Sequence, residues 1–95
     1  MPKYVSLFNW TEQGVKSYRD TVDRADAAKK LASNMGGSFE LYWTLGEYDL
    51  VAISEFPDDE SATAFLLGVA SQGNLRTKTM KAFDAGDMRG IIAKG

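Results

Sequence analysis

The sequence predicts an α+β protein of the ferredoxin-like βαββαβ type, with a four-stranded antiparallel sheet and two helices on one face of the sheet. The expected elements follow the order strand, helix, strand, strand, helix, strand, which is the split βαβ arrangement. Both faces of the expected sheet also carry apolar side chains, although two helices can cover only one face. The sequence therefore predicts a second covering layer that a single chain does not supply.

The first strand and the first helix are expected in the first third of the chain. Residues 3–10 alternate in type and are rich in aromatic and β-branched residues, which is typical of a strand. Thr11 is a suitable N-cap for one long helix that ends at Asn34 and Gly36-Gly37, residues that tolerate left-handed backbone. An apolar stripe at spacings of three and four supports this helix. The stripe consists of Val15, Tyr18, Val22, Ala25, Ala28, Leu31 and Met35.

A β-hairpin is expected next. Residues 38–45 and 50–56 both show the alternation of strands. The four residues between them are Gly46, Glu47, Tyr48 and Asp49, a turn that begins with a glycine able to adopt positive φ.

The last part of the chain predicts a second helix, a fourth strand and a short final helix. Pro57-Asp58-Asp59-Glu60 is a helix start, with Asp58 or Asp59 as the cap and acids at the positive helix end. Gly73 ends this helix, residues 74–83 form the strand, and the final helix lies around residues 87–92. The expected buried stripe of the second helix consists of Ala62, Phe65, Leu66, Val69 and Ala70.

The two faces of the expected sheet divide the apolar residues of the first and third strands. Val5, Leu7, Val51 and Ile53 lie on one face, and Tyr4, Phe8, Leu50 and Phe56 lie on the other. A twofold homodimer that packs two sheets face to face is the simplest way to cover the second apolar face. Such a homodimer, or a higher homo-oligomer, would bury about 1,200–2,000 Å² in total.

Composition limits the chemistry that the chain can perform. The 95 residues suit one domain, and 44% apolar with 25% charged residues is ordinary for a folded protein. There is no cysteine and no histidine, which excludes disulfides, thiolate metal sites and a Ser-His-Asp triad. No cofactor and no metal site are therefore expected.

The charge balance and the N-terminal residues predict the location and the classes of partner. The net charge is −2 with interspersed signs, so neither nucleic acid nor a membrane is an expected partner. The first five residues do not resemble an export signal. Together with the absence of disulfides, this predicts a cytoplasmic protein.

Three blocks of sequence resemble the GYD domain family, named for a glycine–tyrosine–aspartate signature. They are residues 9–11 (Asn-Trp-Thr), residues 42–49 with Gly46, Tyr48 and Asp49, and residues 73–79 (Gly-Asn-Leu-Arg-Thr-Lys-Thr). The resemblance covers residues 1–95 as a single domain and implies a dimeric α/β barrel. It does not imply an activity.

Two better-known groups share the architecture that the resemblance implies. Small antibiotic-biosynthesis-type monooxygenases are one, and some of them act without a cofactor. The effector-binding domain of leucine-responsive-type regulators is the other. Residues 46–49 and the threonine-rich residues 76–79 are similar to features of that domain, but the chain carries no helix-turn-helix segment.

The turn contains the first candidate ligand-binding residues. Glu47, Tyr48 and Asp49 can line a polar recess that holds an amine or a hydroxyl of a small ligand. The alternative is a purely structural turn, in which the aspartate accepts hydrogen bonds from free N–H groups.

Asn9, Trp10, Trp43 and Arg76 complete the candidate set. The resemblance to monooxygenases implies that Asn9 and Trp10 lie in a cleft between sheet and helices, where Asn9 would stabilise an oxyanion. The alternative for the tryptophans is a place in the core or an interface. Arg76, with Lys78 two residues on, can neutralise a carboxylate ligand or protect a sheet edge.

Two functional hypotheses follow. The first is a small dimeric domain that binds a small-molecule ligand without catalysis. The second is a cofactor-free, monooxygenase-like enzyme that acts in the cleft between sheet and helices.

Overall fold

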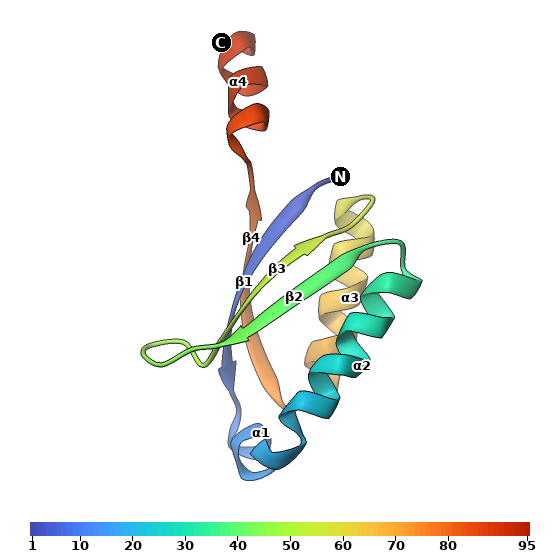
Figure 1. Cartoon of the computed structure of the whole chain (residues 1–95), viewed down its shortest axis with the longest axis vertical. Helices are drawn as coiled ribbons and strands as arrows, with labels where there is room; N and C mark the ends of the chain where they lie inside the picture. Colours follow the sequence, from blue (N-terminus) through green and yellow to red (C-terminus); the bar gives the residue numbers. More distant parts are fainter.

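The four strands form one antiparallel sheet with the order β2-β3-β1-β4. The computed structural model describes all residues, 1–95. The strands are β1 (Lys3–Trp10), β2 (Ser38–Trp43), β3 (Leu50–Glu55) and β4 (Leu75–Ala82). Helices α2 (Thr21–Asn34) and α3 (Asp59–Ser71) lie on the same face of this sheet, α2 over β2 and α3 over β4 (Figure 1). The predicted ferredoxin-like fold is confirmed.

The strand register fixes which side chains share a face. Val5 lies opposite Ile53, and Leu7 lies opposite Val51, across the two central strands. Because side chains alternate along a strand, their sequence neighbours point to the helices. The division of apolar residues between two faces is therefore as predicted.

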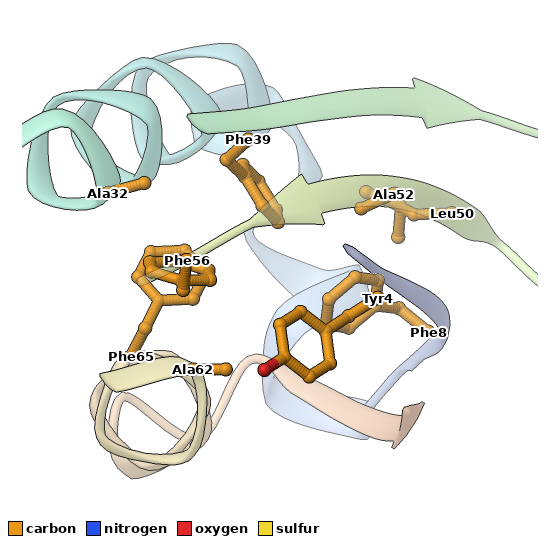
Figure 2. Close-up of a cluster of buried hydrophobic side chains, with 9 residues drawn as sticks. All are labelled: Tyr4, Phe8, Ala32, Phe39, Leu50, Ala52, Phe56, Ala62 and Phe65. Carbon is orange, nitrogen blue, oxygen red and sulfur yellow. The ribbon is translucent and has the colours of Figure 1, made fainter. Parts of the chain in front are cut away.

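The core lies between the helices and the sheet, and four phenylalanines occupy its centre (Figure 2). Phe39 and Phe65 pack with ring centroids 5.1 Å apart, and Phe56 and Phe65 with centroids 5.0 Å apart, both tilted. Such tilted pairs add to the free energy gained by burying the rings. The buried cluster consists of Tyr4, Phe8, Ala32, Phe39, Leu50, Ala52, Phe56, Ala62 and Phe65.

The prediction of one long first helix is wrong. The segment forms α1 (Glu12–Lys16), the single 3₁₀ turn η1 (Tyr18–Asp20) and then α2. The break lies at Ser17, whose carbonyl and hydroxyl oxygens accept hydrogen bonds from the guanidinium of Arg24. Because a side chain seven residues further along the chain holds this break, the periodicity of the apolar residues does not reveal it.

The break also shifts the buried stripe of the helical segment. Four residues of the predicted stripe are exposed instead of buried: Val15 at 45%, Tyr18 at 50%, Val22 at 56% and Leu31 at 40%. Instead α2 meets the sheet through small residues, with Ala25 and Ala32 buried. In α3 the predicted stripe is confirmed for four residues, but the fifth, Ala70, is exposed.

The remaining ends differ by a few residues from the sequence-based bounds, and the final helix α4 (Ala85–Lys94) is longer than expected. A capping box explains its start, because Asp84 accepts from the Asp87 N–H and Asp87 accepts from the Asp84 N–H. Helix α4 projects beyond the sheet and buries none of its residues (Figure 1).

Gly14 allows α1 to dock against the start of β4. A Cβ atom at this position would lie 2.0 Å from the carbonyl oxygen of Asn74, which also accepts the N–H of Thr11 at 3.1 Å. The predicted cap is confirmed, since the Thr11 hydroxyl accepts the N–H of Gly14 at 3.0 Å. The glycine thus permits a close backbone approach that any side chain would prevent.

We expect Gly14→Ala to lower the free energy of unfolding by about 2 kcal/mol, because the new methyl group overlaps backbone that cannot move away. The matched control is Gly68→Ala in α3, where a Cβ would meet only the Leu31 side chain at 3.9 Å. That variant should gain up to about 1 kcal/mol from helix propensity. Urea unfolding measures both, and equal effects would contradict the close approach.

Candidate functional site

The glycine–tyrosine–aspartate turn is held to the end of β1 by the carboxylate of Asp49. Its Oδ2 accepts the backbone N–H of Trp10 at 2.9 Å and the side-chain amide of Asn9 at 3.4 Å. The Asp49 N–H donates to the carbonyl of Phe8 at 2.9 Å, and Gly46 adopts a φ of 135°. This geometry agrees with the structural alternative for the turn, in which the carboxylate of Asp49 accepts hydrogen bonds from free N–H groups.

The other two candidate residues of the turn are arranged differently. Glu47 is exposed, and only its carbonyl oxygen is used, as the acceptor of the Asn9 amide at 3.0 Å. The ring of Tyr48 is half-buried, and the Nζ of Lys78 lies 5.9 Å from its centroid. This distance allows a weak cation–π attraction between the ring of Tyr48 and the ammonium of Lys78 on the edge strand β4.

Asn9 and Arg76 lie opposite each other in the pairing of β1 with β4. Asn9 stands between Phe8 and Trp10, whose side chains point to the helices, so its own side chain lies on the other face. The oxyanion role in the cleft that the enzymatic hypothesis gives to Asn9 is not supported by this position. Arg76 shares the face of Asn9 and is exposed on the edge strand.

The two tryptophans lie on the helix side of the sheet. Trp10 is half-buried and packs against the core cluster. Trp43 is 43% exposed, and its indole N–H donates to the hydroxyl oxygen of Thr21 at 3.0 Å, which ties the end of β2 to the start of α2. The predicted site residues therefore divide between two faces of the sheet and do not form one site.

A pocket of about 80 Å³ lies between α2 and the sheet, beside Trp10. Ten of its fourteen lining residues are apolar, among them Phe39, Leu41 and Leu50 from the sheet. Its polar lining comes from the helical layer and the turn before β4. These polar residues are Thr21, Arg24, Gln72 and Asn74.

A second polar cluster between α3 and the edge strand was missed by sequence reasoning. The Tyr4 hydroxyl donates to Asp59 Oδ1 at 2.5 Å, and the Nζ of Lys81 lies 3.1 Å from the same oxygen. Buried hydroxyls continue the cluster, with Ser6 and Thr79 joined at 2.9 Å. Its signal was the row of polar residues at every second position of β4, which the register places beneath α3.

The environment of this cluster changes the acidity of two groups. Burial, reinforced by the hydrogen bond to Asp59, raises the pKa of Tyr4 to about 12. The hydrogen bond from Tyr4, together with that from Lys81, lowers the pKa of Asp59 below its ordinary value. Both shifts favour a neutral phenol beside an ionised carboxylate, which is the state with the most favourable hydrogen bond.

The face of the sheet away from the helices carries no covering element. We call it the open face, formed by Val5, Leu7, Tyr42, Val51, Ile53 and Met80. Tyr42, Ile53 and Met80 are 55%, 47% and 50% exposed.

No three metal-ligating side chains gather anywhere in the chain. None of the helices has both the length and the apolarity that a membrane crossing needs.

We expect Asp49→Ala to lower the free energy of unfolding by about 1–3 kcal/mol, because the Trp10 N–H loses its acceptor. Glu47→Ala, in the same turn, is the matched control and should change stability by less than about 0.5 kcal/mol, since its side chain makes no hydrogen bond. Chemical denaturation compares the two variants. Equal losses would show that Asp49 does not hold the turn.

We expect one phenol to titrate near pH 12 and Tyr4→Phe to remove that step from the phenolate absorbance. The raised pKa has a consequence for stability. The contribution of the neutral phenol is complete below the ordinary tyrosine pKa of about 10 and is lost as the pH rises toward about 12. Across this pH range, the free energy of unfolding should therefore fall less steeply in Tyr4→Phe than in the natural chain. A variant that instead loses a step near pH 10 would contradict the assignment.

Comparison with known proteins places the chain among its relatives. The model of the GYD domain family matches residues 4–92. A protein of Thermus thermophilus, named glutamine synthetase and cystathionine beta-lyase binding protein, is 26% identical over an alignment of 93 positions. The match covers 93% of this chain and 95% of that protein.

Solved structures share the fold. The crystal structure of TTHA0845 from Thermus thermophilus superposes with a TM-score of 0.58 and 25% identity, covering 90% of this chain and 96% of that one. At3g17210 from Arabidopsis thaliana gives a TM-score of 0.59 at 13% identity over the same shares of the two chains, a likeness of fold alone. Because the family model spans nearly all residues and its signature forms the turn that Asp49 holds, this chain belongs to the GYD domain family.

Proposed function

We propose that this protein is a non-catalytic binding domain, which works as a homodimer joined through the open face and takes a small molecule into the pocket beneath α2. The observation that carries the binding role is that pocket. It is an apolar recess with four polar residues in its lining, the composition that small-molecule sites share.

The geometry of the turn supports binding rather than catalysis. The polar groups that sequence reasoning offered for chemistry, Asn9 and Asp49, are occupied with each other and with backbone. In the cluster of Tyr4, Asp59 and Lys81, the hydroxyl and the ammonium both contact the carboxylate of Asp59, so these groups are paired with one another. The name of the Thermus relative also supports a binding role, and by analogy the class of protein partner for this dimer is an enzyme.

The open face supports the homodimer. Its apolar side chains form a continuous patch across the two central strands, with Val5 opposite Ile53 and Leu7 opposite Val51. Contiguous exposed apolar surface of this kind usually marks an interface. A second copy of the same face covers it at the spacing of about 10 Å at which sheets pack.

Charges at the two edges of the open face favour one orientation of the dimer. Glu40 lies on the β2 edge, whereas Arg76 and Lys78 lie on the β4 edge. A twofold axis parallel to the strands sets the β2 edge of one protomer against the β4 edge of its partner. The acidic edge of each protomer then lies beside the cationic edge of its partner, which favours this arrangement.

We expect Ile53→Arg to convert the dimer into a folded monomer, because a guanidinium at the centre of the interface loses its hydration without a partner. Leu67→Arg is the matched control, since Leu67 is an exposed leucine (66%) of α3 on the helix layer. Sedimentation velocity at micromolar concentration should give a dimer for the natural chain and for Leu67→Arg. A monomeric natural chain, or a dimeric Ile53→Arg, would contradict the proposed interface.

A further inference from the structure

We propose that the pocket beneath α2 selects a small amphipathic monocarboxylate, whose apolar body fills the recess and whose carboxylate binds the guanidinium of Arg24. This assignment rests on the proposed function, because it names the class of ligand that the pocket takes. Its basis is the unusual charge of the lining, the unused donors of Arg24 and the size of the recess.

The lining is electropositive although the whole chain is acidic. The chain has a net charge of −2, with thirteen acidic side chains. None of them lines the pocket, whereas one arginine does. A cation in the lining of an apolar recess that contains no carboxylate favours an anionic ligand group.

Arg24 retains donors for a ligand. Its Nη1 donates to the Ser17 hydroxyl at 3.3 Å and its Nη2 donates to the Ser17 carbonyl at 3.1 Å. The three ion pairs of the structure join other residues, so no carboxylate neutralises this half-buried guanidinium. A guanidinium has five N–H donors in a plane, and the two bonds to Ser17 hold that plane in place while other donors stay free.

The polar residues beside Arg24 also present donors. The Thr21 hydroxyl oxygen accepts the Trp43 indole N–H, which leaves its own proton to donate. The Oδ1 of Asn74 accepts from Gln13 at 3.0 Å, which leaves the Asn74 amide N–H₂ free. A carboxylate only accepts hydrogen bonds, so it matches a rim of donors better than a neutral amide or an ammonium does.

The recess limits the apolar body of the ligand. Its walls come from Phe39, Leu41, Leu50, Leu75 and the α2 residues Ala28 and Leu31. A volume of about 80 Å³ is well below that of pockets for drug-sized molecules. The walls therefore fit a branched aliphatic body of about four or five carbons.

The test is calorimetric titration of the full-length protein with matched pairs of probes. Isovalerate and isocaproate supply the carboxylate, and isovaleramide and isocaproamide are their neutral counterparts of nearly the same shape. We expect each carboxylate to bind at least about tenfold more tightly than its amide, the ratio that a charge-assisted hydrogen bond provides.

Three variants locate the binding. Arg24→Gln should weaken carboxylate binding about tenfold or more while leaving the affinity for the amides unchanged. Arg19→Gln is the matched control, because Arg19 is exposed on the neighbouring turn η1 and lies against Tyr18 instead of the pocket. Ala28→Leu should abolish binding of both members of each pair, because its added carbons fill the recess.

The outcomes separate this assignment from the proposed function. Amides that bind as tightly as carboxylates, or an Arg24→Gln protein with undiminished affinity, would overturn the carboxylate and leave small-molecule binding in place. Ala28→Leu protein that binds normally, or no binding of any probe, would overturn the pocket as well, while the dimer would still be decided by sedimentation. If Arg24→Gln does not fold, the ratio of carboxylate to amide affinity in the natural chain decides whether the pocket selects a carboxylate.

Discussion

The packing of one sheet face against α2 and α3 is the interaction on which the rest of this structure depends. Tyr4, Phe8, Leu50 and Phe56 meet the helices, and the alternation of a strand then forces Val5, Leu7, Val51 and Ile53 to the other side. The sheet cannot be apolar on one face only, because both sets occupy the same two central strands. The homodimer that we propose is a direct consequence of that distribution.

The residues of the family signature stabilise the fold, and they do not line the pocket. Asp49 joins the hairpin turn to the end of β1, and Asn9 is held in the same set of hydrogen bonds. The turn thereby fixes the position of Trp10, whose indole borders the pocket on the helix side. A polar motif on one face thus positions an apolar residue on the other, and this explains why the signature residues and the pocket do not coincide.

Much of the fold could be predicted because it depends on local pattern. The bounds of β1, the caps at Thr11 and Asp58 and the helix-ending glycines agree with the sequence-based expectation. The break at Ser17 could not be predicted, since it depends on hydrogen bonds from Arg24, one residue of a later helix.

The candidate site was harder to predict than the fold. The alternation that points Phe8 and Trp10 toward the helices already implies that the side chain of Asn9 lies on the opposite face of the sheet. The resemblance to monooxygenases implied a cleft between sheet and helices beside Trp10, but not the composition of its lining. The recess results from α2 meeting the sheet through alanines, which leave space that larger side chains would have filled. Arg24 carried no signal in the sequence beyond a charge on an expected helix.

Whether a second copy covers the open face can be measured by nuclear Overhauser contacts in a dimer mixed from methyl-labelled and unlabelled chains. We expect contacts between protomers that involve the methyl groups of Leu7, Val51 and Ile53, and protection of these methyl groups from a soluble paramagnetic probe. Methyl groups that show no contact between protomers and are fully accessible to the probe would contradict the proposed homodimer.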